Sequence, residues 1–334
     1  MKNEISIIIP NFNGMKFLPE CIESLRKQSV RNFDILVVDN ASSDGSREWL
    51  QKNGICSLFL EENLGFAGGV NAGLSTVDTK YVILLNNDTI VFEDYVERLR
   101  EAIELSENIF SVSSMMIQAK NRDLIDDAGD GFCILGWAYQ IGVGERIEKY
   151  QKPRAVFSAC AGAAIYRKSV LDEIGFFDEM HFAYLEDIDL GYRARLFGYE
   201  NRYEPRARVY HLGSATSGSK YNSFKVRLSA RNTIYLNYKN QSNIQLCFNA
   251  LPLLCGVLIK ALFFLKKGFF KDYLFGLKEG FSTCGRCKRA DFKSLPIKRL
   301  LRLEWEMILG MFAYIGHFIG RRMSKKGKQS HIST

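Results

Sequence analysis

Residues 81–91 read Tyr-Val-Ile-Leu-Leu-Asn-Asn-Asp-Thr-Ile-Val, a run of five apolar residues that ends at three polar side chains. Such a run, entered from a polar turn, is typical of an interior strand of a parallel sheet rather than of a helix. Polar residues at the carboxyl end of such a strand lie where open α/β sheets bind their ligands. Asp88 is therefore a candidate for binding a charged ligand. The alternative is that Asn86, Asn87 and Asp88 form an ordinary turn, which Asn and Asp favour.

Segments with the character of strands and of helices alternate on both sides of this stretch. Strands are predicted at residues 5–9, 33–38 and 55–60, and helices near Pro19 and over about 45–52 and 93–106. This alternation predicts an α/β fold with a right-handed, largely parallel sheet.

Polar side chains also follow the other predicted strands. They are Asn11 and Asn13, Asp39 and Ser42, and Asn63. Because the carboxyl ends of parallel strands meet at one edge of a sheet, we expect these clusters to converge with residues 86–88 on one crevice.

A glycine-rich stretch occupies residues 63–73, Asn-Leu-Gly-Phe-Ala-Gly-Gly-Val-Asn-Ala-Gly. We expect it to form a turn before a helix, where the backbone can approach a phosphate closely. It has neither the G-x-G-x-x-G spacing of a dinucleotide site nor the Lys-Ser/Thr of a P-loop, which disfavours NAD binding and ordinary ATP hydrolysis.

The regular pattern is lost between about residues 107 and 155. We expect loops around short strands, which form either a lid for an acceptor or only a long connection. Asp126, Asp127 and Asp130 lack the spacing and the terminal Glu of a calcium loop, so a solvated turn is predicted for them.

Residues 158–211 hold two further candidates. Glu186, Asp187 and Asp189 stand at a predicted helix start, where acidic residues are favourable in any protein. One of these carboxylates could instead act as a general base toward a substrate hydroxyl. His211 ends a predicted strand, and as a metal ligand it requires a partner carboxylate in space.

Chain length and cysteine usage bound the class of protein. A chain of 334 residues suggests one large or two modest domains. No signal sequence is visible at the amino terminus, and scattered cysteines such as Cys21, Cys160, Cys247 and Cys255 favour reduced core thiols in a cytosolic protein. The single C-x-x-C pair, Cys284 and Cys287, has no second pair, which disfavours zinc.

The positive charge belongs to the end of the chain. Residues 1–239 carry 28 Lys and Arg against 32 Asp and Glu, whereas residues 240–334 carry 17 against five.

The end of the chain also contains two apolar stretches, 246–265 and 307–319. The second is followed by Arg321, Arg322, Lys325 and Lys326. This pattern predicts helices that lie on an anionic membrane surface. Nucleic acid is disfavoured, because contact with phosphates does not require such apolar density. Alternatively, these helices pack onto the rest of the chain or join two copies in a homo-oligomer. Asn249, Pro252 and Lys260 argue against a membrane span over 246–265.

Five motifs occur in order along the chain. They are Ser-Ile-Ile-Ile-Pro-Asn-Phe-Asn-Gly at 6–14, Val-Val-Asp-Asn-Ala-Ser-Ser-Asp-Gly-Ser at 37–46, the glycine-rich stretch at 63–73, Leu-Asn-Asn-Asp-Thr at 85–89, and Gly-Phe-Phe-Asp…Tyr-Leu-Glu-Asp-Ile-Asp-Leu within 175–190. Together they resemble family 2 glycosyltransferases of the GT-A fold, in the rhamnosyltransferase-like branch that builds bacterial surface polysaccharides. The resemblance covers about residues 4–240. It implies a Rossmann-like, mostly parallel sheet flanked by helices, so we expect a catalytic domain over 1–240 and a basic, apolar helical region over 241–334.

The resemblance also implies the ligands and the residues that bind them. A nucleoside-diphosphate sugar, dTDP- or UDP-linked, would bind with Mg²⁺ or Mn²⁺. The metal-binding DxD motif falls on residues 86–88 with Asn86 in place of its first Asp, and Asp88 and His211 are the implied metal ligands. The implied nucleotide contacts are Pro10, Phe12, Asn13, Asp39, Asn63, Gly65, Asn71, Asn86 and Asn87. Asp187 matches the catalytic base, and Glu186 would raise its proton affinity or bind the acceptor.

The implied activity is that of a hexosyltransferase-type glycosyltransferase (EC 2.4 class). Transfer would invert the anomeric carbon in a single displacement, with rhamnose as the family-level expectation for the sugar and a polyprenyl-linked saccharide as the acceptor. No Gln-x-x-Arg-Trp motif occurs in the chain, which predicts non-processive transfer. The expected location is cytoplasmic, peripheral on the inner face of the cell membrane. The alternatives are a transferase that acts directly on polyprenyl phosphate and an inactive nucleotide-sugar-binding scaffold.

Overall fold

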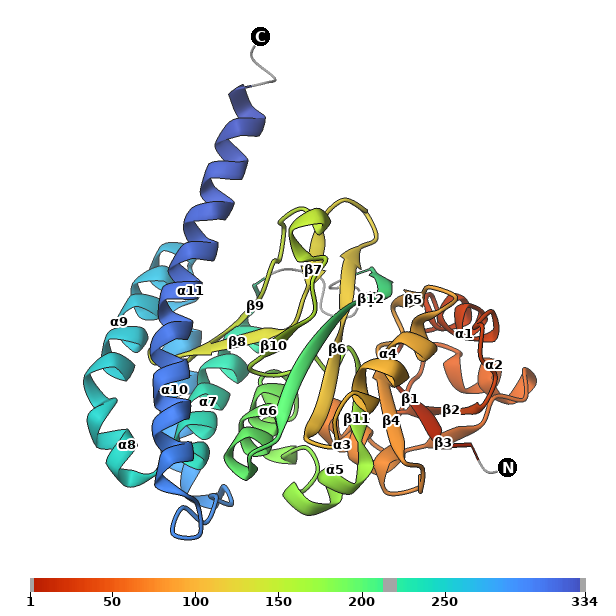
Figure 1. Ribbon diagram of the computed structural model, residues 1–334, viewed down its shortest axis with the longest axis horizontal. Coiled ribbons are helices and arrows are strands. Elements are labelled where there is room, and N and C mark those ends of the chain that lie inside the picture. Colours follow the sequence, from red (N-terminus) through yellow and green to blue (C-terminus); the bar gives the residue numbers. More distant parts are fainter. Residues whose placement is uncertain (1–2, 213–220, 331–334) are drawn as a thin grey trace.

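The computed structural model describes residues 3–212 and 221–330, and of residues 320–330 only the backbone. Four parallel strands form the amino-terminal half of the central sheet: β1 (Ile5–Asn11), β2 (Phe33–Asp39), β3 (Ser57–Phe59) and β4 (Tyr81–Leu85). They lie in the order β4-β1-β2-β3 (Figure 1). The predicted strands are therefore confirmed.

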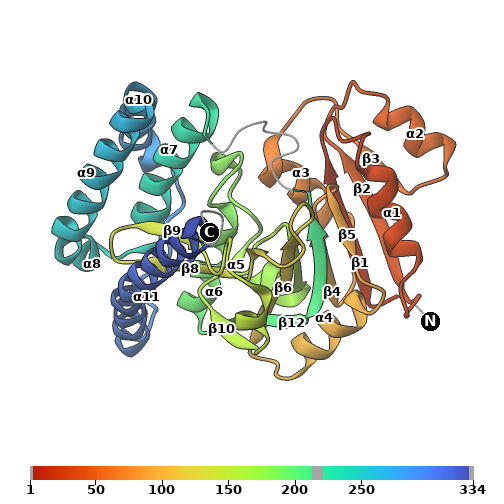
Figure 2. The ribbon, with the colours of Figure 1, turned by 90° about the horizontal axis from the view of Figure 1, so that it is seen from above.

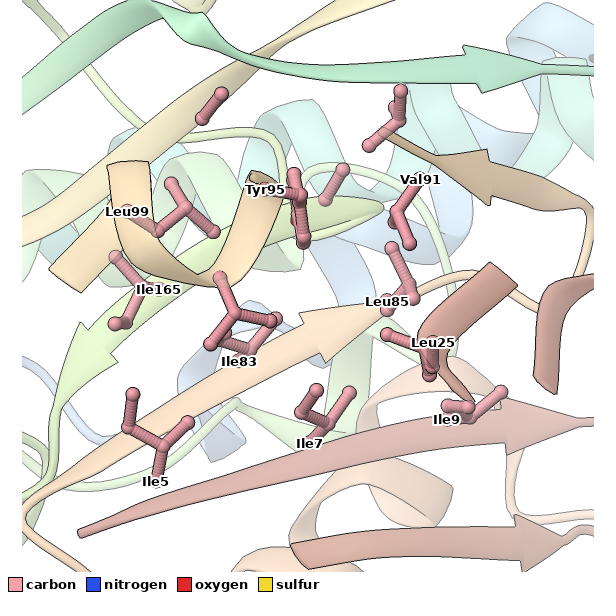
Figure 3. Close-up of a cluster of buried hydrophobic side chains, with 14 of the residues drawn as sticks. Ile5, Ile7, Ile9, Leu25, Ile83, Leu85, Val91, Tyr95, Leu99 and Ile165 are labelled. Atoms are coloured by element: carbon pink, nitrogen blue, oxygen red, sulfur yellow. The ribbon is translucent and has the colours of Figure 1, made fainter. Parts of the chain in front are cut away.

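Both faces of these strands are covered, which explains their continuous apolar sequences. Ile7 and Ile83 point to the face covered by α1 (Leu18–Arg26) and α4 (Tyr95–Glu104), where Tyr95 and Leu99 complete the core (Figure 3). The next residues along the strands point to the opposite face. That face is covered by α3 (Gly65–Leu74), α5 (Lys168–Ile174) and α6 (Glu186–Phe197). The remaining helix of this half is α2 (Ser46–Lys52).

The rest of the central sheet mixes strand directions. β11 (Ala163–Arg167) is antiparallel to both β4 and β6 (Ile109–Gln118), and β12 (Glu200–His211) is parallel to β6. The short strands β5 (Thr89–Val91), β7 (Ile125–Asp127) and β10 (Arg154–Val156) pair at its edges. A separate hairpin contains β8 (Asp130–Cys133) and β9 (Trp137–Gln140). The α/β fold with helices on both faces is confirmed.

Two sequence expectations are wrong in detail. Of the stretch 63–73, only Asn63 and Leu64 precede a helix as expected, while residues 65–73 belong to the helix α3 itself. A Cβ at Gly73 would lie 2.8 Å from Ile8 and 2.9 Å from Val38, so this glycine brings the helix close to the sheet. The region 107–155 contains β6, a buried strand of ten residues. Its buried serines hide the strand pattern, and two of them are hydrogen-bonded: the hydroxyl of Ser111 to Asn201 at 2.8 Å and that of Ser114 to the carbonyl of Ala163 at 2.7 Å.

The carboxyl-terminal part consists of helices. They are α7 (Ser223–Asn240), α8 (Asn243–Phe248), α9 (Ala250–Lys267), α10 (Phe270–Thr283) and α11 (Ile297–Ser330), accompanied by the short 3₁₀ helix Cys284–Arg286. Figures 1 and 2 show α8, α9, α10 and α11 at the end of the molecule opposite β1, β2 and β3. Two more 3₁₀ helices, Ile147–Tyr150 and Glu179–His181, lie in connections.

The stretch 246–265 is interrupted at Asn249, where α8 ends and α9 begins. Among residues 3–212 and 221–330, no helix combines the length and apolarity that a membrane span requires. Cys247 and Cys255 are exposed on these helices, so the expectation of core thiols is wrong for them, while Cys21 is buried as expected. The side chains of Arg321, Arg322, Lys325 and Lys326 lie outside the described part.

Candidate active site

The carboxyl ends of β1, β2 and β4 are joined by a buried chain of polar side chains. The amide of Asn87 donates to Asn11 Oδ1 at 2.7 Å, and the amide of Asn11 donates to Asp39 Oδ2 at 2.9 Å. Asn11, Asp39 and Asn87 are all buried. The predicted convergence of the strand ends is therefore confirmed. It follows from the register of the parallel strands, which pairs Asn11 with Asp39.

The carboxylate of Asp39 is completely buried and fully paired within the protein. It accepts hydrogen bonds from the guanidinium of Arg47 at 2.8 Å and from the N–H of Ser42 at 3.0 Å. Arg47, on α2, also donates to the carbonyl of Leu60 and stacks over Phe59. Arg47 was missed from the sequence, since nothing in its local context marks it as the partner of a strand-end carboxylate. Its side chain is 33% exposed, whereas that of Asp39 is completely buried, so Arg47 is the member of this ion pair that a ligand can reach.

The other predicted nucleotide contacts near this edge lie at the end of β1 and in the loop that follows it. Pro10 is half-buried at the end of β1, and Phe12 is 36% exposed beside it, so an aromatic face is open to a ligand. Asn13 has a φ of 51°, and its carbonyl side-chain oxygen accepts from the N–H of Ser43 at 2.8 Å. Asn13 therefore shapes the loop that presents Phe12.

Asn63 and Gly65 stand where α3 begins. Asn63 Oδ1 accepts hydrogen bonds from the N–H of Gly65 at 2.9 Å and from the amide of Asn40 at 3.0 Å. Gly65 has a φ of 73°, and a Cβ there would lie 2.4 Å from the carbonyl oxygen of Phe182. Asn40, missed from the sequence, is buried and completes this arrangement by donating to the carbonyl of Gly65 at 2.8 Å.

Asn71 differs from the other predicted nucleotide contacts. Its side chain bonds to Phe177 and Glu179, away from the strand ends. Its amide donates to the carbonyl of Phe177 at 2.8 Å and to the carboxylate of Glu179 at 2.9 Å, and its oxygen accepts from the N–H of Phe177 at 3.0 Å. These bonds tie α3 to the segment that precedes the 3₁₀ helix Glu179–His181.

Asp88 and His211 lie side by side, as predicted. Nε2 of His211 is 3.3 Å from Oδ1 of Asp88, and the backbone carbonyl of Asp88 accepts from the N–H of Leu212 at 3.0 Å. On its other side, Nδ1 of His211 is 2.7 Å from Oδ2 of Asp126. Burial lowers the pKa of His211, but the hydrogen bonds and charges of Asp126 and Asp88 outweigh it and raise the pKa to about 10.

This pair fits a divalent cation. Two ligand atoms about 3.3 Å apart are spaced as neighbouring ligands of one cation whose bonds are about 2.0–2.2 Å long. Asp126 holds Nδ1, the usual outer-shell arrangement for a ligating histidine. Because its pKa is raised to about 10, His211 carries a proton on Nε2 at neutral pH, and a cation that binds Nε2 would displace that proton. Asp126 was predicted in a solvated turn, which is wrong. Its partner His211 lies 85 residues away and could not be read from local sequence.

Asn86 and Asp187 meet at the turn formed by residues 160–162. The N–H of Asn86 donates to the carbonyl of Gly162 at 2.8 Å, while the N–H of Ala161 makes a long hydrogen bond of 3.4 Å to Oδ2 of Asp187. A Cβ at Gly162 would lie 2.9 Å from the amide nitrogen of Asn86. The stretch that carries Asp88 therefore adjoins this short turn, and so does the predicted base, Asp187.

Glu186 and Asp187 are the first two residues of α6, as predicted. Burial raises the pKa of Asp187, and the N–H groups of Ala161 and Ile188 lower it only in part. Glu186 is more deeply buried, and its Oε2 has no hydrogen-bond partner. Burial, followed by the charge of Asp187, raises the pKa of Glu186 to about 8. Asp187, only half-buried, is the carboxylate of the pair that a substrate can reach.

A second acidic cluster lies beside Asp187. Ligand atoms of Asp127, Asp130 and Cys160 lie within 4.8 Å of one another. Asp127 and Asp130 are buried, so the solvated turn predicted for them is wrong. Burial is the main cause that raises the pKa of Asp127 to about 7. Burial, followed by the charge of Asp127, raises the pKa of Asp130 well above its ordinary value. A thiol suits Mg²⁺ or Mn²⁺ poorly, so the Asp88–His211 pair is the better cation site.

The segment before α6 has an unusual backbone. Phe182, Tyr184 and Leu185 have φ values of 61°, 71° and 68°, which non-glycine residues rarely adopt. The carbonyl of Phe182 accepts from the N–H of Ala67 in the first turn of α3 at 3.2 Å. This strained segment thus joins the start of α3 to the start of α6, and strain of this kind collects at functional sites.

Comparison with known proteins identifies relatives of this chain. The model of "Glycosyl transferase family 2" matches residues 6–175. The glycosyltransferase GlyG of Streptococcus pneumoniae is 33% identical over 109 residues, which is 31% of this chain and 36% of that protein. The poly-beta-1,6-N-acetyl-D-glucosamine synthase of Staphylococcus epidermidis is 24% identical over 219 residues, 64% of this chain and 51% of that protein. The chain thus spans between about a third and a half of the length of these two relatives.

Solved structures support the fold. GalNAc-T7, solved with UDP, GalNAc and Mn²⁺, superposes with a TM-score of 0.57 at 16% identity, covering 70% of this chain and 47% of its own. The mannosyltransferase PcManGT from Pyrobaculum calidifontis, solved with GDP-Man and Mn²⁺, gives 0.52 at 13% identity, covering 93% and 85%. These likenesses confirm the GT-A fold class. Because the family model matches just over half of the 334 residues and includes the strand ends described above, this chain belongs to glycosyltransferase family 2.

Proposed function

We propose that this chain transfers a sugar from a nucleoside-diphosphate sugar to an acceptor hydroxyl, with inversion at the anomeric carbon. The observation that carries the proposal is the turn at residues 160–162. It contacts Asn86, two residues before Asp88, and the carboxylate of Asp187. The stretch that carries Asp88 and the proposed base, Asp187, therefore adjoin one turn, which supports a displacement at a sugar diphosphate with Asp88 and His211 as the proposed cation ligands.

The donor nucleotide would bind at the ends of β1 and β2. Phe12 offers an exposed aromatic face to the base, and Arg47 brings a positive charge that Asp39 holds in position. Asp88 and His211 would hold Mg²⁺ or Mn²⁺, which neutralises the charge that grows on the departing diphosphate. With Asn86 in place of an acidic residue, the site carries one negative charge fewer than the full DxD motif.

Asp187 is proposed to take the proton from the acceptor hydroxyl as that oxygen attacks the anomeric carbon. Its raised pKa increases the proton affinity of the carboxylate, which favours proton abstraction near neutral pH. Glu186, with a pKa of about 8, keeps its proton at pH 7 and so limits charge repulsion beside the base. The buried Asp127 and Asp130 border the same carboxylate.

The finer features rest on the sequence motifs. We propose a catalytic domain over residues 1–240, a helical region over 241–334, a saccharide acceptor linked to a polyprenyl carrier on the cytoplasmic side, and the addition of one or a few sugars. Rhamnose from dTDP-rhamnose is one candidate donor, and UDP-linked sugars are the other. The similarity to the poly-beta-1,6-N-acetyl-D-glucosamine synthase of Staphylococcus epidermidis favours a role in cell-surface polysaccharide formation.

A donor panel tests the proposal. The full chain is incubated with dTDP-rhamnose, UDP-GlcNAc, UDP-GalNAc or GDP-mannose and Mn²⁺, and release of the nucleoside diphosphate is measured with and without saccharide-polyprenyl diphosphate or polyprenyl phosphate. Release with one donor that depends on the saccharide acceptor supports the proposal, while release that requires polyprenyl phosphate supports the direct transferase. Donor binding without release identifies an inactive scaffold. Asp187→Asn is expected to abolish release while donor binding persists.

A further inference from the structure

The exposed apolar side chains of this molecule are concentrated on the carboxyl-terminal helices. Among the described residues, all but five of the exposed large apolar side chains lie on α8, α9, α10 and α11. Proteins that are monomeric in water rarely expose continuous apolar patches above a few hundred Å². The exposed apolar surface at this end of the molecule therefore indicates a binding partner.

Helix α9 has one packed face and one open face. On the packed face, a Cβ at Gly256 would lie 2.2 Å from the carbonyl oxygen of Leu135, so the helix rests on the tip of the β8–β9 hairpin. The open face is a stripe at helical spacing whose members are each more than half exposed. They are Leu251, Leu254, Leu258, Leu262 and Leu265.

Helix α11 also has one packed face and one open face. Leu303 and Met307 are buried in a core shared with Phe132, and Gly310 closely approaches the carbonyl of Phe132. The open face carries four large apolar side chains that are 47–62% exposed. They are Leu301, Trp305, Leu309 and Phe312. The packed faces attach α9 and α11 to the rest of the chain. Packing among the described residues does not explain the apolar side chains of the open faces.

The charges around these stripes are sorted by sign. Three of the four acidic residues of these helices pair with arginines of α6 and α7: Asp272 with Arg227, Glu279 with Arg231, and Glu306 with Arg195. The fourth, Glu304, accepts a hydrogen bond from the amide of Gln245 at 3.0 Å. The lysines that border the open face of α9 and the start of α10 are exposed, namely Lys266, Lys267 and Lys271. The outer surface of the helical region is consequently apolar and positive at once.

We propose that the open faces of α9 and α11 bind the surface of an anionic lipid bilayer. A bilayer supplies both complements, since its acyl region accepts leucine and tryptophan side chains and its headgroups attract lysines. A second copy of this chain fits less well. A two-fold dimer would place the same positive patch against itself, because such an interface uses one surface on both subunits.

Vesicle binding of the full chain tests this directly, without any sugar substrate, so the result is independent of the proposed transfer activity. Co-sedimentation is measured with vesicles of phosphatidylcholine alone and with 30% phosphatidylglycerol. We expect at least tenfold tighter binding to the anionic vesicles, and loss of that difference at high salt. Equal binding to both vesicle types, or none to either, overturns the proposal.

Two sets of variants locate the binding surface. Leu254→Asn combined with Leu258→Asn is expected to reduce binding at least tenfold, whereas Leu105→Asn, an equally exposed leucine after α4, leaves it unchanged. Lys266→Gln, Lys267→Gln and Lys271→Gln together should weaken binding to anionic vesicles, in contrast to the triple control Lys27→Gln, Lys52→Gln and Lys152→Gln. Circular dichroism establishes that each variant is folded. Equal effects of the test and control variants, or a dimer in sedimentation velocity that the leucine substitutions dissociate, would refute the bilayer as the occupant.

Discussion

The side-chain amide of Asn232, in the middle of α7, donates a hydrogen bond to the carbonyl oxygen of Tyr184 at 2.7 Å. The same amide reaches the carbonyls of His181 and Ala183, both at 2.9 Å. Backbone conformations with positive φ at Tyr184 and Leu185 cost about 1–3 kcal/mol each and persist only where the surroundings hold them. Asn232 is therefore a positioning residue for the segment that starts α6 and carries Asp187.

Asn232→Ala is expected to lower kcat by about 100-fold, the loss that a displacement of a reacting group by about 1 Å produces. Donor affinity should change little, because the donor would bind at the ends of β1 and β2. The measurement is kcat with the active donor, beside calorimetry of donor binding.

Thr233→Ala provides the control for this substitution, since within the described part of the chain the hydroxyl of Thr233 bonds only to the carbonyl of Ser229 in α7 itself. A parallel loss of donor affinity and kcat in Asn232→Ala would indicate general disruption rather than misplacement of the base.

Asp126→Asn is expected to weaken Mn²⁺ binding about 10- to 100-fold, the usual effect of removing the outer partner of a ligating histidine. The substitution removes the charge that holds Nδ1 of His211 at 2.7 Å. Mn²⁺ binding is measured by electron paramagnetic resonance in the presence of the nucleoside diphosphate. The neighbouring exposed Asp123→Asn serves as the control, and equal behaviour of the two variants would remove His211 from the cation site.

The sequence predicts the parts of this fold that depend on local pattern. The apolar runs of β1, β2 and β4 mark strands because both faces of the sheet are covered, and the polar residues that end them converge because parallel strands share an edge. Asp88, Glu186 and Asp187 stand in the ordered motifs, and His211 is singled out separately at the end of a predicted strand, where it requires a partner carboxylate. For these residues, sequence pattern and structure agree.

What escapes the sequence depends on long-range contacts. Asp126 looks like a turn residue until β7 and β12 bring it to His211. Arg47 and Asn232 act on groups in other elements, and neither position carries a local signal. Burial of Asp127 and Asp130 is unforeseen because charged residues are rarely buried, and their raised pKa values are part of how the fold tolerates them.

Glu186 should make folding stability depend on pH. Its folded-state pKa of about 8 lies above the ordinary 4.5, so between these values the folded chain keeps a proton that the unfolded chain has released. Stability contributed by this group therefore falls as pH rises from about 4.5 to 8, by up to about 1.4 kcal/mol per pH unit.

Glu186→Gln removes this dependence. Relative to the parent protein, the free energy of unfolding of the variant should therefore increase as pH rises through this window. Urea unfolding at pH 5, 6, 7 and 8 measures the difference. Glu48→Gln, at an exposed position on α2, is expected to follow the parent. Parallel curves for Glu186→Gln and the parent would show that Glu186 is ionised in the folded chain.

Lys239→Met is expected to destabilise the fold by about 3–5 kcal/mol, the cost of removing one partner from a buried ion pair. The Lys239 ammonium lies 2.7 Å from Asp178 and 2.9 Å from Asp189, and the side chain of Asp189 is completely buried. Because Arg193 still pairs with Asp189 at 3.0 Å in this variant, the loss should fall toward the lower end of that range.

Lys168→Met supplies the matched comparison for Lys239→Met. Lys168 pairs with the exposed Asp172 one turn away on α5, and a pair of this kind contributes about 1 kcal/mol or less. Urea unfolding of both variants gives the two costs. Equal losses would mean that the buried carboxylates do not depend on α7. A much larger loss for Lys239→Met would show that α7 stabilises the fold through the two carboxylates that Lys239 contacts, Asp178 and Asp189, the latter two residues beyond the proposed base, Asp187.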